Sequence, residues 1–367
     1  MDRIELQPEQ LEHFLSQRER QPVKIEEIAL LGSQTTGAAA LKGLGYGRPL
    51  RVTYSAPDKH KQVVIRRINK NEFGRETEPD RVEEVWRNFH TFNRLPQHVR
   101  AYDMIGVGRD GRLQSMGDVA ELYLLTEYAS GRPYAEDLAI IRDVGIFTSL
   151  DIKRAISLAR YLADIHAVKH DDPILWRRRL RDLVGHGEGV MGLTDSYRLS
   201  EAPFSFTSEE ELREIETAVN QWRWQLKPRY HRLSQVHGDF HPFNILFQNG
   251  TQFTLLDRSR GEWGDPADDV CCLMINYLLF SLQRSDGLAE PFFSLYRVFW
   301  ETYLAQSGDE ELLAGAAPWI AWRILVLASP QWYPTLDEPT RRRLLNLARN
   351  VLADDVFDWQ QINRYLS

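Results

Sequence analysis

The sequence contains little cysteine and no long apolar run, and each absence excludes a class of protein. Its two cysteines, Cys271 and Cys272, are adjacent in a chain of 367 residues, so they can form neither a long-range disulfide nor a metal site with the usual ligand spacing. We expect both to be reduced thiols in the core. No stretch approaches the roughly 18 apolar residues that span a bilayer, and the first residues lack the pattern of a signal peptide. We therefore expect a cytoplasmic protein with no membrane partner.

Positive charge is also in deficit. The chain has 45 Lys and Arg against 52 Asp and Glu, a formal net charge of -7, so we expect no nucleic-acid partner. The basic cluster Trp176–Arg181 is accordingly expected to be a solvated helical face. With 43% hydrophobic and 26% charged residues, the chain can bury a large core, which excludes wholesale disorder. At about 150 residues per domain, the length predicts two domains.

The N-terminal third predicts a small antiparallel lobe, residues 1–130. Its apolar spacing and its Gly, Pro and Asp separators indicate a short first helix that ends before Pro22 and then the order β-β-β-α-β-β. The expected strands and helix are Ile25–Leu31, Leu50–Ser55, Gln62–Ile68, about Asp80–Arg94, Asp103–Val107 and Glu121–Tyr128.

The remainder, residues 131–367, predicts a larger and mainly helical lobe. The clearest helix is Asp151–His166, and the tail from Pro291 is expected to be helical with breaks at Pro318 and across Ser329–Pro339. His166 lies on the apolar face of its helix, so we expect a hydrogen-bonded core residue rather than a ligand. Aromatic residues of the tail could form a cage for a cationic substrate, but core packing is favoured for Trp300, Trp319, Trp322 and Trp332.

The residues suited to catalysis and metal binding lie between Val236 and Asp257. Asn249-Gly250 predicts a hairpin with a two-residue turn, and that register places Asn244 opposite Leu255. Asn244 and Asp257 then become diagonal neighbours, close enough for two oxygen ligands to hold one metal ion. Asp239 precedes Asn244 by five residues, in the loop that leads to the same strand. A carboxylate beside such a pair is the arrangement expected where Mg²⁺ bridges phosphates.

These residues carry a family resemblance. His237-Gly238-Asp239, with Asn244 following, resembles the catalytic loop of aminoglycoside phosphotransferase-like and choline kinase-like enzymes, relatives of protein kinases. The resemblance covers roughly residues 25–282 and implies a bilobal protein-kinase-like fold, with residues 1–130 binding nucleotide and residues 131–367 carrying catalysis and the acceptor site. Further residues fall at the spacing of that family, namely Asp257, Gly264-Asp265-Pro266 and Asp269.

The resemblance implies a phosphotransferase that uses ATP or GTP with Mg²⁺. Asp239 would orient or deprotonate the hydroxyl of a small-molecule acceptor, while Asn244 and Asp257 would hold Mg²⁺ on the nucleotide phosphates. His237 and Asp269 are expected to support the loop through hydrogen bonds. His241 could either support the loop in the same way or contact the substrate. Two alternatives stay open: a nucleotide-binding regulatory protein without turnover, and a kinase of the same fold that acts on proteins.

The resemblance also implies nucleotide contacts in the first lobe. Arg66 on the third strand would contact the phosphates, and strand alternation puts Arg67 on the opposite face. Glu83 of the following helix would be its acidic partner. Glu127 and Ala129 lie in a stretch that resembles the hinge between lobes, whose backbone would bind adenine. The segment Gly43–Gly47 could cover the phosphates or form only a flexible turn.

Two arginines, Arg258 and Arg260, follow Asp257 closely. They could neutralise phosphate or recognise an anionic acceptor, or they could pair internally with Glu262 and Asp265. We favour internal pairing and, with it, a neutral or cationic acceptor.

Overall fold

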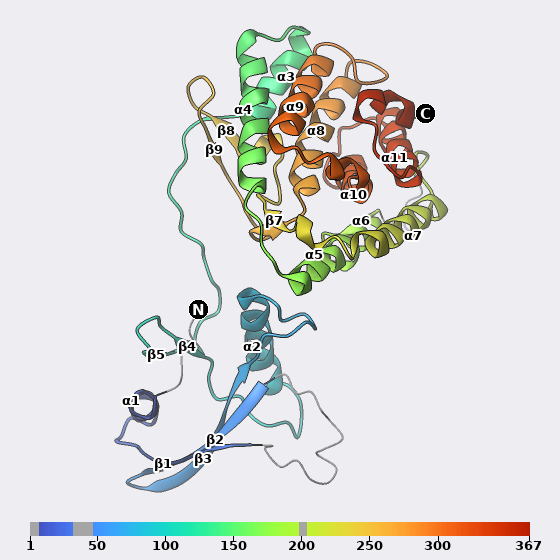
Figure 1. The fold of residues 1–367 in the computed structure, drawn as a ribbon. Helices are drawn as coiled ribbons and strands as arrows, with labels where there is room; N and C mark the ends of the chain where they lie inside the picture. The colour runs from blue at the N-terminus through green and yellow to red at the C-terminus, as the bar shows by residue number, and fades with distance from the viewer. Residues whose placement is uncertain (1–6, 32–46, 198–203) are drawn as a thin grey trace. The chain divides into compact units, whose positions relative to one another are not determined.

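The computed structural model describes residues 7–31, 47–197 and 204–367 and divides the chain into two units, Met1–Thr126 and Glu127–Ser367. The first unit carries an antiparallel sheet and the second carries most of the helices (Figure 1). The predicted α+β class, with a small sheet-containing lobe and a larger helical lobe, is confirmed. Among the described residues, no helix combines the length and the apolar character that crossing a membrane requires.

The first unit is built on a three-stranded antiparallel sheet in the order β1 (Lys24–Leu30), β2 (Gly47–Ala56) and β3 (Lys59–Ile68). The first helix, α1 (Pro8–Glu19), covers one face of the sheet because its apolar side chains recur at helical spacing. The buried cluster between helix and sheet includes Leu11, Phe14, Leu15, Val52 and Tyr54.

Two elements of this unit differ from the expectation. The helix α2 (Glu78–Phe92) forms where predicted, but β4 (Ile105–Val107) pairs with β5 (Leu113–Ser115), a strand that we did not predict. The predicted strand Glu121–Tyr128 is wrong, because this stretch has no regular secondary structure. Apolar residues alone do not make a strand, since its backbone N–H and C=O groups need a neighbouring strand to pair with.

Helices dominate the second unit. The central one, α8 (Pro266–Leu282), is buried at every position and is surrounded by α3, α4, α9 and α10 (Figure 1). Its Cys271 and Cys272 are buried free thiols, as predicted. The other α-helices described in the unit are α3 (Tyr134–Val144), α4 (Ser149–His166), α5 (Pro173–Gly185), α6 (Val190–Ser196), α7 (Glu209–Leu226), α9 (Phe292–Ser307), α10 (Ala317–Ala328) and α11 (Glu338–Ala353).

The helical tail follows the predicted breaks. Pro318 and Pro339 lie in the first turns of α10 and α11, where proline is tolerated because its missing N–H would have no partner inside the helix. Of the four tryptophans, Trp300, Trp319 and Trp322 are buried in the core, whereas Trp332 is exposed. Short 3₁₀ turns complete the unit, at Tyr230–Arg232, Pro242–Asn244, Glu310–Ala314 and Trp359–Leu366.

Short strands carry and flank the segment singled out above. A sheet in the order β6 (Arg132–Pro133), β8 (Ile245–Phe247) and β9 (Phe253–Leu255) contains the hairpin, and β7 (Ser234–Gln235) pairs with β10 (Trp263–Gly264). The predicted register is wrong by one residue: Leu255 faces Ile245 and not Asn244. Of the two predicted turn residues, Asn249 and Gly250, only Gly250 has a positive φ, +63°. A two-residue type I′ turn needs a positive φ at both positions. The loop therefore takes three residues, 249–251.

Candidate functional site

The loop between β7 and the 3₁₀ turn Pro242–Asn244 carries Asp239, and Asp269 of α8 holds its backbone. The Asp269 carboxylate accepts hydrogen bonds from the backbone N–H groups of His237 (2.7 Å) and Gly238 (2.8 Å). Gly238 has a φ of +87°, a conformation that favours glycine. Although burial raises the pKa of Asp269, hydrogen bonds from His166 and from the His237 backbone hold that pKa below its ordinary value. The predicted supporting role of Asp269 is confirmed.

Two buried histidines stabilise the same loop. His166 places Nδ1 at 2.9 Å from the Tyr303 hydroxyl and Nε2 at 3.2 Å from Asp269, so it is the hydrogen-bonded core residue that we predicted. His237 accepts a hydrogen bond at Nδ1 from the backbone N–H of Asp239 (3.3 Å), and burial lowers the pKa of His237. Both side chains therefore fix the loop from inside.

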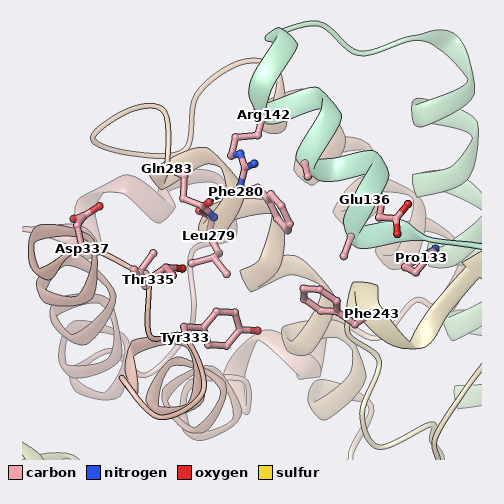
Figure 2. A pocket seen from close by; sticks show the side chains of 13 residues that line it. Pro133, Glu136, Arg142, Phe243, Leu279, Phe280, Gln283, Tyr333, Thr335 and Asp337 are labelled. Carbon is pink, nitrogen blue, oxygen red and sulfur yellow. Dashed lines mark hydrogen bonds between the residues drawn. The ribbon is translucent and has the colours of Figure 1, made fainter.

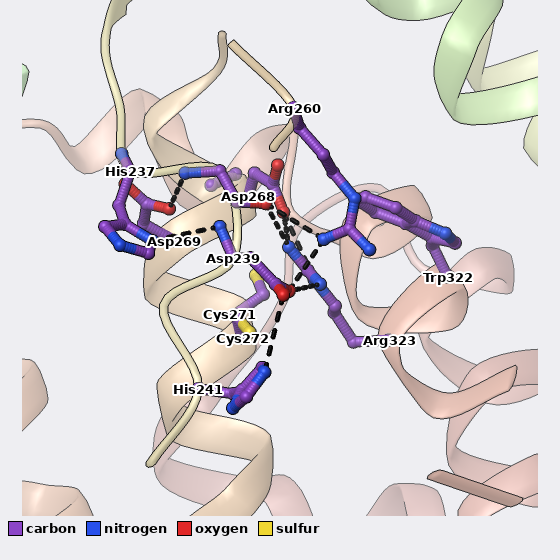
Figure 3. A network of polar contacts seen from close by, with 12 residues as sticks. His237, Asp239, His241, Arg260, Asp268, Asp269, Cys271, Cys272, Trp322 and Arg323 are labelled. Atoms are coloured by element: carbon purple, nitrogen blue, oxygen red, sulfur yellow. Dashed lines mark hydrogen bonds and ion pairs between the residues drawn. The ribbon is translucent and has the colours of Figure 1, made fainter. Parts of the chain in front are cut away.

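The Asp239 carboxylate is held by two arginines (Figure 3). Its Oδ1 accepts hydrogen bonds from Arg260 Nη1 (2.7 Å) and Arg323 Nη1 (2.8 Å), and both guanidinium groups also donate to the carbonyl of Gly238. Burial raises the pKa of Asp239, but the hydrogen bond from His241 and the charges of Arg323 and Arg260 outweigh it and hold that pKa far below its ordinary value. The side chain is 14% exposed and ionised at neutral pH.

The second carboxylate oxygen of Asp239 is more loosely engaged. His241 Nδ1 accepts a hydrogen bond from the backbone N–H of Phe243, so its proton lies on Nε2, which is 3.4 Å from Asp239 Oδ2. The amide nitrogen of Asn244 lies 3.3 Å from the same oxygen. These contacts are long for hydrogen bonds, so Oδ2 is the oxygen with remaining capacity to accept a proton or a hydroxyl group.

Asn244 and Asp257 lie together at the end of the hairpin. Asn244 turns its amide nitrogen to the Asp239 carbonyl (3.1 Å), and its backbone carbonyl accepts from the N–H of Leu256 (2.9 Å), the residue before Asp257. Asp257 is exposed, has a φ of +53°, and accepts at Oδ1 from the Ser259 N–H (3.0 Å).

These two side chains fit a magnesium ion. Within the described chain, Oδ1 of Asn244 and Oδ2 of Asp257 accept no hydrogen bond, which leaves a neutral and an anionic oxygen free. The described residues contain no group of three or more His, Cys, Asp and Glu side chains suited to a metal. Mg²⁺ suits such a sparse set, because it binds through one or two carboxylates and keeps water or phosphate ligands.

A cavity of about 470 Å³ opens beside Asp239, and we name it the Asp239 cavity. Asp257 also lines this cavity, so the carboxylates of Asp239 and Asp257 both border the same cavity. The other side chains are mainly apolar or aromatic: the full lining is Glu188, Leu193, Asp239, His241, Phe243, Asp257, Ser259, Arg260, Cys272, Ile275, Asn276, Arg323, Val326, Leu327, Trp332 and Tyr333.

The partners that we predicted for Arg258 and Arg260 are wrong. Arg258 donates to the backbone carbonyl of Val236 (2.9 Å), and Arg260 pairs with Asp239 and lies over the Trp322 ring at 4.7 Å. The predicted partners are engaged elsewhere: Asp265 pairs with the buried Arg232 at 2.9 Å, and Glu262 accepts from the indole of Trp263. Arg260 thus pairs inside the protein with Asp239 and also lines the Asp239 cavity, whereas Arg258 binds a backbone carbonyl.

Sequence reasoning missed Arg323 and Asp268. Arg323 is 5% exposed on α10 and binds Asp268 of α8 in addition to Asp239. A signal was present, since Arg323 is the one charged residue of the α10 sequence APWIAWRILVLA, and a charge in an apolar helix needs a partner when it is buried. Neither sequence spacing nor periodicity identifies that partner.

The residues predicted to bind nucleotide are not brought together in the first unit. Arg66 is exposed on β3 and makes no hydrogen bond or ion pair within the described chain, while Glu83 is exposed and pairs with Arg87 at 3.1 Å. The buried carboxylate of α2 is Glu84, which pairs with Arg75.

The residues predicted to form the hinge that binds adenine are Glu127 and Ala129. Glu127 and Ala129 lie in the irregular segment at the start of the second unit. The glycine-containing segment Gly43–Gly47 lies outside the described residues except for Gly47, the first residue of β2.

Comparison with known proteins identifies the family. A family model described as "Phosphotransferase enzyme family" (APH) matches residues 89–305, whereas no curated protein matches the chain.

Several solved structures are similar at low sequence identity. The ADP-bound aminoglycoside phosphotransferase APH(2'')-Ib is 16% identical with a TM-score of 0.34, and the match covers 96% of this chain and 100% of that one. Choline kinase from Cryptosporidium parvum Iowa II is 11% identical with a TM-score of 0.33, over 93% and 87% of the two chains. The amicoumacin kinase hAmiN, in complex with AMP-PNP, Ca²⁺ and Ami, is 13% identical with a TM-score of 0.41, over 95% and 96%. The family match spans more than half of the sequence, and the chain therefore belongs to the phosphotransferase enzyme family.

Proposed function

We propose that the protein transfers the γ-phosphate of ATP or GTP to a hydroxyl group of a small molecule. One observation carries this proposal beyond family membership. The Asp239 carboxylate is fixed by two guanidinium groups at one oxygen, keeps capacity at the other, and lines the same cavity as Asp257. That arrangement offers an oriented anionic acceptor beside a pair of free oxygen ligands, which suits phosphoryl transfer.

In this proposal Asp239 orients the acceptor hydroxyl more than it activates it. Its strongly lowered pKa makes it a weak base, and a weak base suffices where the transition state is loose and the proton leaves late. Oδ1 is held by Arg260 and Arg323, so Oδ2 is the atom that accepts the hydroxyl hydrogen bond and then the proton.

Asn244 and Asp257 would hold Mg²⁺ through their free oxygens. When bound, the ion neutralises charge on the nucleotide phosphates. Arg66 remains our prediction for the phosphate contact, and the backbone of Glu127 and Ala129 for the base. For the acidic partner of Arg66 we retain Glu83 and add Glu84, because Glu84 is the buried carboxylate of α2.

The direct test is transfer of label from γ-labelled ATP or GTP to a small-molecule extract by wild type and by Asp239→Asn. We expect a labelled small molecule with wild type and a rate lower by ~10²-fold or more in the variant, the usual loss for a positioned acid–base group. Near-ultraviolet circular dichroism and nucleotide calorimetry of the variant show whether its fold and nucleotide affinity persist. Nucleotide binding without transfer would favour the regulatory protein, and label in a protein fraction would favour a protein-directed kinase.

A further inference from the structure

A second cavity, of about 590 Å³, lies in the second unit beside α3 (Figure 2), and we name it the α3 cavity. Nothing in the proposed chemistry uses it. It shares Phe243 and Tyr333 with the Asp239 cavity, and Figure 2 shows the Tyr333 hydroxyl directed toward Phe243. The full lining is Pro133, Ala135, Glu136, Ala139, Arg142, Phe243, Leu279, Phe280, Gln283, Tyr333, Thr335, Leu336 and Asp337.

Phe243 and Tyr333 form the junction between the two cavities. Phe243 directly precedes Asn244 and is 52% exposed, so its ring offers an apolar surface next to the candidate site. Tyr333 lies between α10 and α11, and its backbone carbonyl is held by Arg341. The exposed ring of Phe243 gains contacts only when a molecule covers it.

The Tyr333 hydroxyl makes no hydrogen bond within the described chain, although the ring is partly buried. Burial, with a contribution from the charge of Asp239, raises the pKa of Tyr333 to about 12. The hydroxyl therefore keeps its proton at neutral pH and can both donate and accept. A partly buried tyrosine hydroxyl usually has a partner, and at this junction a bound molecule would supply one.

The carboxylates of the Asp239 cavity are engaged. Asp239 holds two guanidinium groups, Asp257 is assigned to the metal, and Glu188 lies 3.4 Å from Arg260. Each of the three carboxylates therefore has a cation assigned to it, an arginine for Asp239 and Glu188 and the metal for Asp257, and none is left to bind an ammonium group of an acceptor.

The α3 cavity offers few carboxylates that could bind a cationic acceptor. Asp337 caps α11 by accepting from the backbone N–H (2.8 Å) and the hydroxyl of Thr340, and the lining residue Arg142 is itself paired with Asp143 at 2.7 Å. Glu136 is the one acidic lining residue without a hydrogen bond or ion pair in the described chain, and it is exposed. A polycation needs several such carboxylates, so the two cavities together suit an uncharged molecule.

From these observations we propose that the acceptor is an elongated, uncharged alcohol that spans both cavities. Its reacting hydroxyl lies at Asp239, its body crosses Phe243 and receives a hydrogen bond from the Tyr333 hydroxyl, and its apolar end occupies the α3 cavity. This inference rests on the proposed function, because it takes Asp239 as the hydroxyl-binding group.

Alkyl glucosides are suitable probes, because they join a neutral head with many hydroxyls to an apolar tail of chosen length. Binding of methyl, butyl and hexyl glucoside is measured by calorimetry without nucleotide. We expect affinity to rise with tail length, by up to about fourfold per methylene, and aminohexyl glucoside to bind more weakly than butyl glucoside. Ala139→Phe, which fills only the α3 cavity, should remove the gain with length and leave methyl glucoside unaffected.

Tyr333→Phe tests the hydroxyl itself. We expect about fivefold weaker binding of each glucoside, the scale of one hydrogen bond, with an unchanged unfolding temperature because no internal bond is lost. The matched control is Tyr296→Phe, whose hydroxyl donates to the Trp359 carbonyl (2.9 Å) in the core. That control should unfold at a lower temperature and bind the glucosides as wild type does.

Several results would overturn the inference: no glucoside binding, affinity independent of tail length, tightest binding by the aminohexyl probe, or wild-type affinity in Tyr333→Phe. The readout is binding, so its failure is distinguishable from failure of the proposed function. Phosphate transfer to an acceptor that is indifferent to Tyr333 and Ala139 overturns only the inference. Length-dependent binding without any phosphate transfer overturns the proposed function.

Discussion

Removing Arg323 should destabilise the second unit and slow phosphate transfer together. In Arg323→Met the buried Asp268 loses its cation, and the carbonyl of Gly238 loses one of its two guanidinium donors. Breaking a buried ion pair from one side costs about 3–5 kcal/mol, because the remaining charge is left without a partner.

The titration of Asp268 contributes part of that cost. Burial already raises the pKa of Asp268 from 3.8 to about 6 against the opposing charge of Arg323. Without Arg323 the carboxyl must be neutral in the folded state. Keeping a carboxyl of ordinary pKa 3.8 protonated at pH 7 costs roughly 4 kcal/mol, of which wild type already bears roughly 3 kcal/mol because its folded-state pKa is about 6. The titration of Asp268 therefore accounts for about 1 kcal/mol of the loss, and the hydrogen bonds that Arg323 no longer donates must account for the rest. We expect the penalty to be smaller at pH 5, where protonation costs less.

The measurement is urea unfolding followed by tryptophan fluorescence. Trp86 is the one tryptophan of residues 1–126, so the other nine of the ten report on the second unit. Arg154→Met is the matched control, because Arg154 forms a buried pair with Asp137 and lines neither cavity. Asp137 keeps Arg132 as a second cation, so the control should lose less stability than Arg323→Met and should retain the transfer rate of the folded protein.

The double variant Arg323→Met with Asp268→Leu separates charge from packing. Replacing both members of a buried pair by apolar residues is often neutral, so the double variant should recover most of the lost stability. It should not recover the transfer rate, because Asp239 still lacks one of its two cations. Arg323→Met with near wild-type stability at pH 7, or a double variant as unstable as the single one, would refute the reasoning.

Three further predictions concern the metal, the nucleotide and the pH dependence. Asp257→Ala should weaken binding of Mg²⁺–nucleotide by removing an anionic ligand, and unchanged affinity by calorimetry would rule out that role. Arg66→Ala should raise the KM for nucleotide and Arg67→Ala should not, since the two side chains alternate across β3; equal KM values in both variants would contradict the assignment. Because the folded-state pKa of Asp268 is raised to about 6, its contribution to stability is complete below pH 4 and is lost as pH rises through 6. Relative to Asp268→Asn, wild type should therefore lose roughly 2.5 kcal/mol between pH 4 and pH 7, and parallel curves would show that Asp268 does not titrate in this range.

Local patterns predicted much of the fold. The first three strands, α2, α4 and the tail helices follow from apolar periodicity and from prolines at helix starts. The hairpin was found at its correct place but in the wrong register, because the φ angles of Asn249 and Gly250 decide between a two-residue and a three-residue loop. The strand at Glu121–Tyr128 failed for a related reason, since pairing depends on a partner that the segment itself does not encode.

The sequence predicted only some residues of the candidate site. Asp239, Asn244 and Asp257 could be found because they are close in sequence and one hairpin relates them. Arg323 follows Asp239 by 84 residues, and its approach depends on the packing of α10 against α8. Such a contact is a property of tertiary structure, which explains why the sequence suggested nearby acids, and not Asp239, as partners of the basic residues.

The adjacent acids of α8 show why this packing matters for Asp239. Asp268 and Asp269 lie in the first turn of a fully buried helix, where the helix dipole favours negative charge. Asp269 accepts a hydrogen bond from the N–H of Gly238. Asp268 accepts one from Arg323 and so orients this arginine, which donates to the carbonyl of Gly238. The peptide groups on both sides of Gly238 are thus held by one turn of one helix. Since Asp239 follows directly, its position is set by a helix that is buried at every residue, and the orienting role that we propose for Asp239 requires such a fixed position.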